Sequence, residues 1–114
     1  AFMRRVAQAF DVRAVRHSDV TEVCREIRRV AICTGSGHSL ISDAMAASAD
    51  IYITADLKYN DFMAGENRMI LMDIGHFESE FCAINILDDV LSKKLCNFAV
   101  RKSLCSRNPI NYLL

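Results

Sequence analysis

The stretch Met69-Ile70-Leu71-Met72-Asp73-Ile74-Gly75-His76 decides the fold that this sequence predicts. Its first four residues form a short apolar run, which indicates a buried strand. Gly75 then indicates a turn, because glycine adopts backbone conformations that other residues avoid. A long helix is expected to follow, since apolar residues recur at spacings of three and four, at Phe77, Phe81, Ile84, Leu87 or Asp88, Leu91 and Leu95. This stripe is typical of a helix that packs on a core.

The same order of strand, turn and helix occurs twice more upstream. Strands are predicted at 29–33 and 51–54, and the helices expected after them span 39–48 and 57–64, with Gly65 as the C-cap of the second. Strands that alternate with helices are typical of right-handed parallel crossovers. The sequence therefore predicts an α/β fold in three layers. Its sheet is mixed and mostly parallel, helices cover both faces, and the chain is built from consecutive strand-helix-strand units.

Less regular elements are predicted on either side of this repeating region. A helix is expected at 2–10, an imperfectly alternating strand at 12–16, a loop at 17–26 and a last strand at 98–102. A chain of 114 residues has the ordinary length of one domain. We therefore predict a single domain over residues 1–114.

The composition excludes several classes of protein. An apolar fraction of 52% with 25% charged residues is typical of a globular chain. The sequence contains no apolar run of the roughly 18 residues that a membrane span needs, and no signal-peptide pattern. The five cysteines are odd in number and form no Cys-x-x-Cys pair, which indicates buried free thiols in a reducing compartment. The sequence thus predicts a cytoplasmic protein with no membrane partner.

The net charge of zero is unevenly distributed along the chain. Residues 1–30 carry seven basic and four acidic groups, residues 31–90 carry two basic and ten acidic groups, and residues 91–114 carry five basic groups and no acidic group. A carboxylate-rich centre suits a cation and argues against nucleic acid as a partner. Solvated surface acids are the alternative interpretation of the same centre.

A histidine and a glutamate begin the helix predicted after Gly75. His76 and Glu80 are four residues apart, so they share one face of that helix. An imidazole and a carboxylate on one face suit a borderline divalent metal ion. The alternative interpretation is a glutamate favoured by the helix dipole beside a histidine that only caps the helix.

Three turns that follow strands are expected to meet at one edge of the sheet. They begin at Thr34, Ala55 and Gly75, and the ends of neighbouring parallel strands lie along the edge where α/β sheets bind ligands. The first turn is suited either to an anion held by backbone N–H groups or to a tight turn that needs glycine. Asp56 is suited to a place near a metal or to a helix cap. The residues expected to line this cleft or contact a substrate are Thr34, Gly35, Ser36, His38, Asp56, Lys58 and Tyr59, with Lys58 and Tyr59 suited to an anionic substrate.

Four segments of the chain resemble one known family. They are 29–37 (RVAICTGSG), 50–62 (DIYITADLKYNDF), 73–80 (DIGHFESE) and 108–113 (NPINYL). Together they resemble the C-terminal part of the NGG-interacting factor 3-like (NIF3-like) proteins. These are dinuclear metal-centre proteins, often named GTP cyclohydrolase I type 2 homologues. The resemblance extends from about Phe2 to Leu113.

The resemblance implies a two-lobed α/β protein that holds two divalent metal ions per full-length subunit and assembles as a homo-oligomeric ring. It implies that His76 and Glu80 are metal ligands within a Gly-His-x-x-x-Glu motif. A histidine pair and an aspartate from an N-terminal lobe would complete the site, and these have no counterpart in the present residues. The chain is therefore expected to be the C-terminal lobe and to hold an incomplete site. Zinc, iron, manganese and magnesium are not distinguished.

The resemblance supports two hypotheses of function. The first is the metal-binding lobe of a dinuclear metal-dependent hydrolase with an unknown substrate, in which two cations would acidify a water. The second is an assembly or regulatory module that contacts a protein partner and has no catalysis of its own. The family often has a histidine where this chain has Asn60, which weakens any catalytic role of that position.

Overall fold

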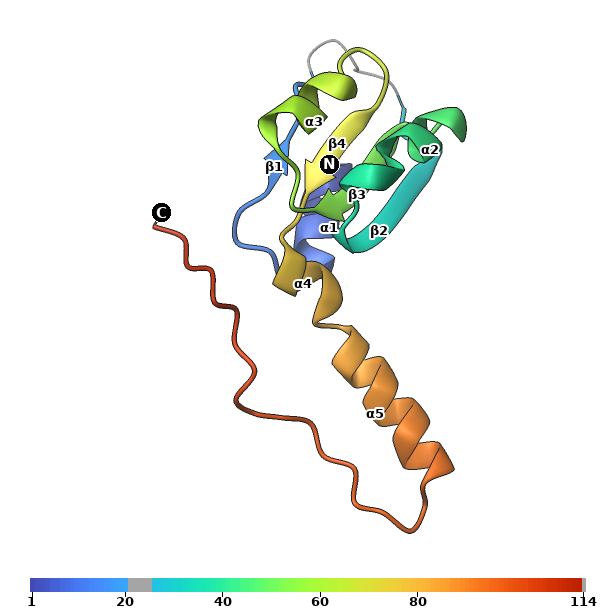
Figure 1. Ribbon diagram of the computed structural model, residues 1–114, viewed down its shortest axis with the longest axis vertical. Helices are drawn as coiled ribbons and strands as arrows, with labels where there is room; N and C mark the ends of the chain where they lie inside the picture. The colour runs from blue at the N-terminus through green and yellow to red at the C-terminus, as the bar shows by residue number, and fades with distance from the viewer. Residues whose placement is uncertain (21–25, 114) are drawn as a thin grey trace.

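The computed structural model describes residues 1–20 and 26–113, and a four-stranded sheet lies at its centre (Figure 1). The strand order is β1-β4-β3-β2. The three parallel neighbours are β2 (Val30–Ser36), β3 (Ile51–Ala55) and β4 (Ile70–Asp73). The short β1 (Arg16–His17) pairs with β4 in the antiparallel sense. The predicted α/β fold with a mixed, mostly parallel sheet is confirmed.

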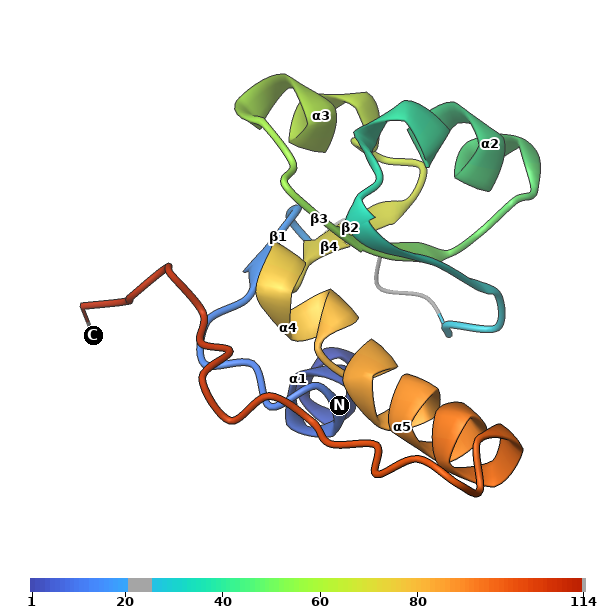
Figure 2. The same ribbon diagram turned by 60° about the horizontal axis from the view of Figure 1, so that its bottom comes forward.

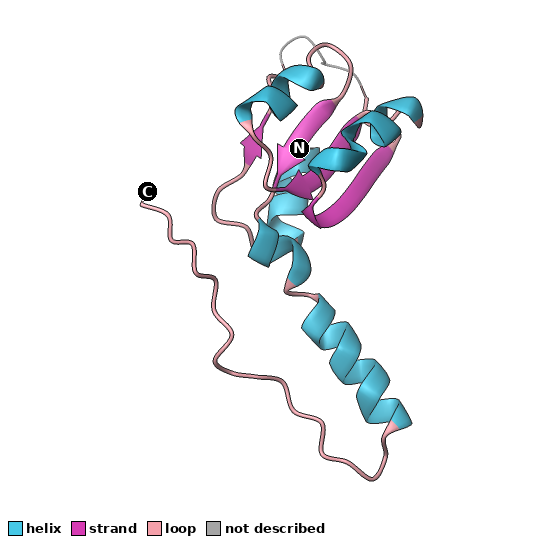
Figure 3. Ribbon diagram, in the orientation of Figure 1, coloured by secondary structure: helices cyan, strands magenta, loops and turns pink. Residues whose placement is uncertain are grey.

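Helices lie on both faces of the sheet and give the molecule three layers (Figures 2 and 3). On one face, η1 (His38–Leu40), α2 (Ile41–Ala46) and α3 (Tyr59–Ala64) cover a buried cluster that includes Ile41, Ala44, Tyr52, Leu57 and Leu71. On the other face, α1 (Phe2–Ala9) places Val6 against a second cluster that includes Ile51, Ile53, Ile70, Met72 and Ile74. Successive strand residues face opposite sides, so β3 and β4 serve both clusters and are buried along their whole length.

Most predicted elements are present, with boundaries that contacts explain. The helix expected at 2–10 is α1, and the strand expected at 29–33 continues to Ser36 through an irregularity between Ile32 and Ser36. The helix expected from residue 57 begins at Tyr59, and the N–H of Leu57 donates to the carboxylate of Asp73 at the end of β4. Gly65 ends α3 as predicted, although its φ of −84° is not left-handed.

Two predicted strands are wrong. The alternating segment 12–16 forms a strand only at its end, since β1 is limited to Arg16–His17. Part of the loop predicted at 17–26 lies outside the described residues. The segment 98–102 forms no strand, because the chain that precedes it leads away from the sheet and leaves it without a partner strand (Figure 3). The side chain of Phe98 is 73% exposed accordingly.

The long helix predicted after Gly75 is two helices. α4 (His76–Glu80) ends at Phe81, and α5 (Ala83–Lys94) then projects away from the sheet (Figure 1). None of the twelve residues of α5 is buried, so the prediction that its apolar stripe packs on a core is wrong within this chain. The radius of gyration of 16.4 Å exceeds the roughly 13 Å of a compact domain of this length. Among the described residues, α5 is met by the C-terminal tail, where Nζ of Lys102 donates to Oδ1 of Asn85 at 3.0 Å and lies 3.7 Å from Oδ2 of Asp88.

The described cysteines are free, as predicted, but three of the four are exposed. These three are Cys82, Cys96 and Cys105, whereas Cys33 is half-buried against the α2 side of the sheet. The prediction that the thiols are buried is therefore wrong for the exposed three. Cys24 lies outside the described residues. In the part of the chain that the structure describes, no helix has the length and apolar character that crossing a membrane requires.

Candidate metal centre

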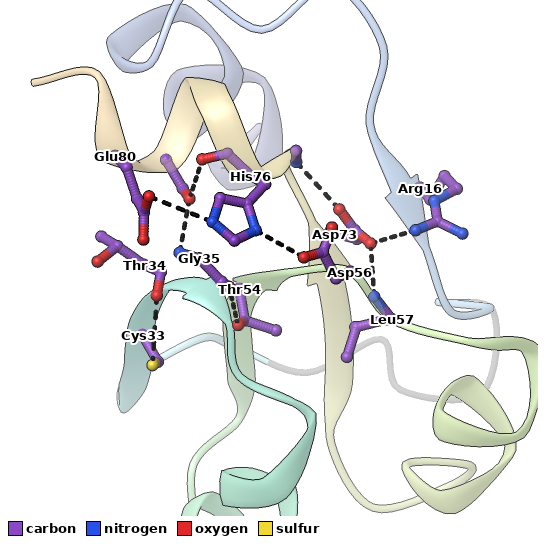
Figure 4. Close-up of polar contacts among 12 residues, drawn as sticks. Arg16, Cys33, Thr34, Gly35, Thr54, Asp56, Leu57, Asp73, His76 and Glu80 are labelled. Atoms are coloured by element: carbon purple, nitrogen blue, oxygen red, sulfur yellow. Dashed lines mark hydrogen bonds and ion pairs between the residues drawn. The ribbon is translucent and has the colours of Figure 1, made fainter. Parts of the chain in front are cut away.

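The turns that follow β2, β3 and β4 meet at one edge of the sheet, as the sequence predicts. The three strands are hydrogen-bonded neighbours that run in the same direction, so their carboxyl ends coincide. α4 begins directly beyond β4 and crosses in front of β2 and β3 (Figure 4). This crossing brings the first turn of α4 against Gly35 and Asp56.

His76 lies between two carboxylates. Its Nδ1 is 2.6 Å from Oδ2 of Asp56, and its Nε2 is 3.2 Å from Oε2 of Glu80 (Figure 4). An ionised carboxylate only accepts hydrogen bonds, so Nδ1 carries a proton and donates it to Asp56. This hydrogen bond is the largest cause of a raised pKa of His76; burial opposes it, and the negative charges of Asp56 and Glu80 add to it. The imidazole is therefore held in an environment that favours positive charge.

Gly35 shapes the floor of this group of side chains. Its φ is +66°, a left-handed conformation that glycine adopts without strain. A Cβ at this position would overlap Oε1 of Glu80 and would come 3.3 Å from Nε2 of His76. The absence of a side chain thus leaves room beside both polar groups.

Hydrogen bonds to neighbouring elements fix the Gly35 turn. Its N–H donates to Oγ of Ser79 at 2.8 Å, and its carbonyl accepts from Oγ1 of Thr54 at 3.1 Å. The hydroxyl of Tyr52 donates to the carbonyl of Gly37 at 2.8 Å. The N–H of Gly35 is therefore already used within the protein, which favours the tight-turn interpretation over an anion site at this residue.

The backbone of Asp56 is held in an uncommon conformation. Its φ is +57°, a left-handed value that costs most side chains energy, although aspartate tolerates it better than most residues. Asp56 does not cap α3, because that helix begins at Tyr59 and the carboxylate of Asp61 accepts the N–H of Lys58 at 2.7 Å. The carboxylate of Asp56 is free to face His76 instead. The structure therefore excludes the helix-cap interpretation of Asp56 and places its carboxylate beside His76.

The remaining predicted cleft residues divide into two groups. Thr34 and Ser36 are exposed at the end of β2, with Thr34 beside Glu80 (Figure 4). His38 instead faces α3, with its Nδ1 3.7 Å from Oδ1 of Asp61. Tyr59 is 80% exposed and lines a separate cavity with residues of α3 and β1, among them Phe62, Met63 and His17. The contacts of His38, Lys58 and Tyr59 therefore lie at α3 and not at His76.

Asp73, at the end of β4, is a functional candidate that the sequence reasoning did not single out. Its carboxylate is buried and bonds to backbone N–H groups of Leu57 and Gly75 and to the guanidinium of Arg16 (Figure 4). A charged residue at the end of a fully buried apolar strand could have indicated this role from the sequence, because a buried charge needs partners.

The donors at His76 and Glu80 fit a divalent metal ion, although they are only two. Two ligands about 2.0–2.1 Å from one tetrahedral ion are themselves about 3.3 Å apart, and the Nε2–Oε2 distance here is 3.2 Å. The hydrogen bond from Nδ1 to Asp56 is the contact that commonly orients a metal-binding imidazole. Among residues 1–20 and 26–113, no three His, Cys, Asp or Glu side chains gather into a group that could hold a metal.

The C-terminal tail returns to the first turn of α4. The side-chain amide of Asn108 donates to Oε1 of Glu78 at 2.8 Å. Burial, with smaller contributions from the charges of Glu78 and Asp73, raises the pKa of Tyr112. The segment 108–113 that carried part of the resemblance thus lies beside the turn that precedes His76.

Comparison with known proteins gives one consistent family. A sequence model described as Duf34/NIF3 (NGG1p interacting factor 3) matches residues 1–109. The chain is 36% identical over 109 residues to a GTP cyclohydrolase 1 type 2 homolog of Campylobacter jejuni, covering 94% of this chain and 42% of that protein. It is 32% identical over 119 residues to a protein of the same name from Streptococcus pneumoniae, covering 96% and 44% respectively.

Solved structures agree on the fold. The Staphylococcus aureus protein SA1388 superposes with a TM-score of 0.78 at 23% identity, covering 98% of this chain and 37% of its own. A Bacillus cereus protein related to NIF3 superposes with a TM-score of 0.76 at 25% identity, covering 98% of this chain and 32% of its own. The chain thus spans about two fifths of the length of the first two curated relatives.

Proposed function

The chain belongs to the Duf34/NIF3 family, and from this premise we propose that it is the metal-binding part of a dinuclear metal-dependent hydrolase. The observation that carries the proposal is the row of polar side chains Asp56, His76 and Glu80, in which one imidazole joins two carboxylates. Such a row is suited to hold a divalent cation at the imidazole nitrogen that faces Glu80.

Each residue of the row has a distinct role in this proposal. Nε2 of His76 and the carboxylate of Glu80 bind the metal, and Asp56 holds the imidazole with its proton on Nδ1, which leaves the lone pair on Nε2 for the metal. Gly35 keeps the space beside both ligands open. Bound divalent ions supply Lewis-acid chemistry, which polarises a carbonyl or phosphoryl oxygen and acidifies water.

The proposal requires further ligands from outside this chain. Two protein ligands bind a transition metal weakly, and catalytic sites commonly offer three. The chain covers 42% of the Campylobacter jejuni relative, so the remaining length of such a protein is where the missing ligands are expected. The substrate is open, and the name of that relative makes GTP the first compound to test.

Substitution of His76 tests this function in the intact protein. His76→Ala should remove most of the bound metal and any hydrolase activity that depends on it, as measured by elemental analysis and by turnover. His38→Ala is the matched control, because His38 also begins a helix but pairs with Asp61 at α3. The proposal fails if His76→Ala retains the metal content of the unsubstituted protein.

A second candidate function is assembly without catalysis, and the exposed apolar side chains of α5 favour it. Ile86, Leu87, Val90 and Leu91 are between 40% and 62% exposed. Apolar side chains grouped on one helix are typical of a surface that another protein covers. This function predicts that His76→Ala keeps the oligomeric state of the intact protein, whereas Leu87→Glu dissociates it in sedimentation velocity. An oligomer unchanged by Leu87→Glu would contradict this second candidate.

A further inference from the structure

Asp73 is an acidic residue whose burial needs an explanation. It ends β4, and only 3% of its surface is exposed. An ionised carboxylate removed from water is costly unless charges or hydrogen bonds compensate it. Asp73 has such compensation on both oxygens, and its partners come from different elements of the fold.

The partners of Asp73 belong to the two turns that carry the candidate site. Oδ2 accepts the N–H of Leu57 at 2.9 Å, and Leu57 directly follows Asp56. Oδ1 accepts the N–H of Gly75 at 3.0 Å, and Gly75 directly precedes His76. One carboxylate therefore fixes the backbone next to both partners of the Asp56–His76 hydrogen bond (Figure 4).

Both of these turns have conformations that need support. Asp56 has a φ of +57° and Gly75 a φ of +87°, so neither turn continues its strand in a regular way. The N–H of Leu57 lies one residue after Asp56, and the N–H of Gly75 belongs to the positive-φ residue itself. Arg16 of β1 pairs with Oδ2 from the edge of the sheet, so the charged partner of this carboxylate is not a ligand of the site.

We infer that Asp73 is a positioning residue that sets the contact between Asp56 and His76 and thereby the orientation of the imidazole toward a metal. This inference rests on the proposed function for its metal-binding consequence, although the hydrogen bond that it describes exists in the metal-free protein. Asp73 touches neither the imidazole nor Glu80, so it acts only through the two turns.

The substitution Asp73→Asn tests the inference in the intact protein. Asparagine keeps the size of the side chain, but its NH₂ group must face a donor, either the N–H of Gly75 or, in the flipped orientation, both the N–H of Leu57 and the guanidinium of Arg16. The first readout is the tautomer of neutral His76 in the metal-free protein, measured by ¹⁵N NMR of the imidazole. The second readout is the affinity for Zn²⁺ in a competition titration. We expect the proton to leave Nδ1 for Nε2 in part of the molecules, and the affinity to fall about tenfold or more.

Ser18→Ala is the matched control for a general loss of stability. The hydroxyl of Ser18 accepts the N–H of Leu71 at 2.9 Å, so it also joins the β1 side of the sheet to the backbone of β4. It contacts neither turn of the site. Ser18→Ala should leave the tautomer and the zinc affinity unchanged, and an equal change in both variants would overturn the inference.

The outcomes separate this inference from the proposed function. If Asp73→Asn keeps the proton on Nδ1 and the zinc affinity within about twofold, Asp73 is not a positioning residue, whatever the protein hydrolyses. If the tautomer changes while the unsubstituted protein binds no metal, the positioning role stands and the proposed function fails.

A backbone substitution tests the same inference where Asp73→Asn does not fold. Leucic acid incorporated in place of Leu57 replaces the N–H with an ester oxygen and removes a single hydrogen bond to Asp73. The side chain of Leu57 and the buried carboxylate are both retained. We expect the same change of tautomer at His76, and an unchanged tautomer would overturn the inference.

Discussion

The protonation state of His76 decides whether its ring can bind a cation. The hydrogen bond to Asp56 and the charges of Asp56 and Glu80 raise its pKa above the ordinary value of about 6.5. A metal ion at Nε2 must displace the proton that this environment favours. Metal affinity should therefore fall about tenfold for each pH unit below the raised pKa, because binding releases one proton. Zn²⁺ competition titrations at several pH values measure this slope.

Asp56→Asn is the variant that identifies the cause of this pH dependence. It removes the charge and the largest contribution to the shift, so the pKa of His76 should return toward its ordinary value, as NMR titration of the metal-free protein measures. A folded-state pKa above the unfolded one stabilises the fold fully below the unfolded pKa, and this stabilisation is lost as the pH rises through the folded pKa. The effect on stability is small, because the side chain of His76 is 46% exposed. A pKa unchanged in Asp56→Asn would contradict the assigned cause.

Gly35→Ala should damage both the fold and the site. The new Cβ would overlap Oε1 of Glu80, and its left-handed backbone costs alanine energy, so we expect a loss of about 1–3 kcal/mol in urea unfolding. The zinc affinity of the intact protein should fall as well, because Glu80 must move. Gly65→Ala is the control, since a Cβ there would crowd Leu71 and the carbonyl of Met69, away from Glu80 and the Gly35 turn. Equal losses of zinc affinity in both variants would contradict a specific role for Gly35.

Sequence spacing predicts some of these contacts because they are local. His76 and Glu80 share a helix face at a spacing of four, which makes the 3.2 Å approach of Nε2 and Oε2 possible. Asp56 can approach His76 only because β3 and β4 are neighbours. The alternation of strands and helices predicts that the two residues lie at the same edge of the sheet, but it does not predict their contact. The role of Asp73 follows from hydrogen bonds to backbone groups of two turns, which leave no pattern of residue types.

The elements differ in how well apolar patterns predict them. β3 and β4 were predicted within one residue, because strands buried on both faces are continuous apolar runs between turns. The apolar stripe after Gly75 is equally clear in the sequence, yet it continues across the gap between α4 and α5 at Phe81 and Cys82. A stripe shows that one face is apolar, and it does not show what that face packs against. The predicted strand at 98–102 is wrong for a related reason, because an apolar run forms a strand only where a partner strand is available.

Substitutions in α5 should show that this helix adds little to the stability of the 114-residue chain. Leu91 is 40% exposed, so Leu91→Lys should change the free energy of unfolding by no more than about 0.5 kcal/mol. Leu71→Ala is the comparison, since Leu71 is fully buried in β4 and its truncation should cost about 2–5 kcal/mol. Urea denaturation of the isolated chain measures both values. A large loss in Leu91→Lys would mean that α5 packs on the sheet.

At the scale of the whole molecule, the sheet has a buried cluster on each face, and the candidate metal site lies at its edge. The clusters on both faces of β3 and β4 need no partner, because α1, α2 and α3 cover them. The site edge offers Nε2 of His76 and the carboxylate of Glu80, and the exposed α5 leaves the same end of the molecule. We therefore expect the part of the intact protein that lies beside this end to cover α5 and to supply the remaining metal ligands.

Metal binding should accordingly depend on the length of protein that is present. Two ligands leave the remaining coordination positions to water, and affinity falls steeply when protein ligands are absent. Elemental analysis of the isolated 114-residue chain after dialysis should therefore find less than one transition metal ion per chain, whereas the intact protein should retain two. His76→Ala in the intact protein should lower this content, and His38→Ala should not. Two ions held tightly by the isolated chain would contradict the argument, because the described residues would then supply a full set of ligands that their geometry does not contain.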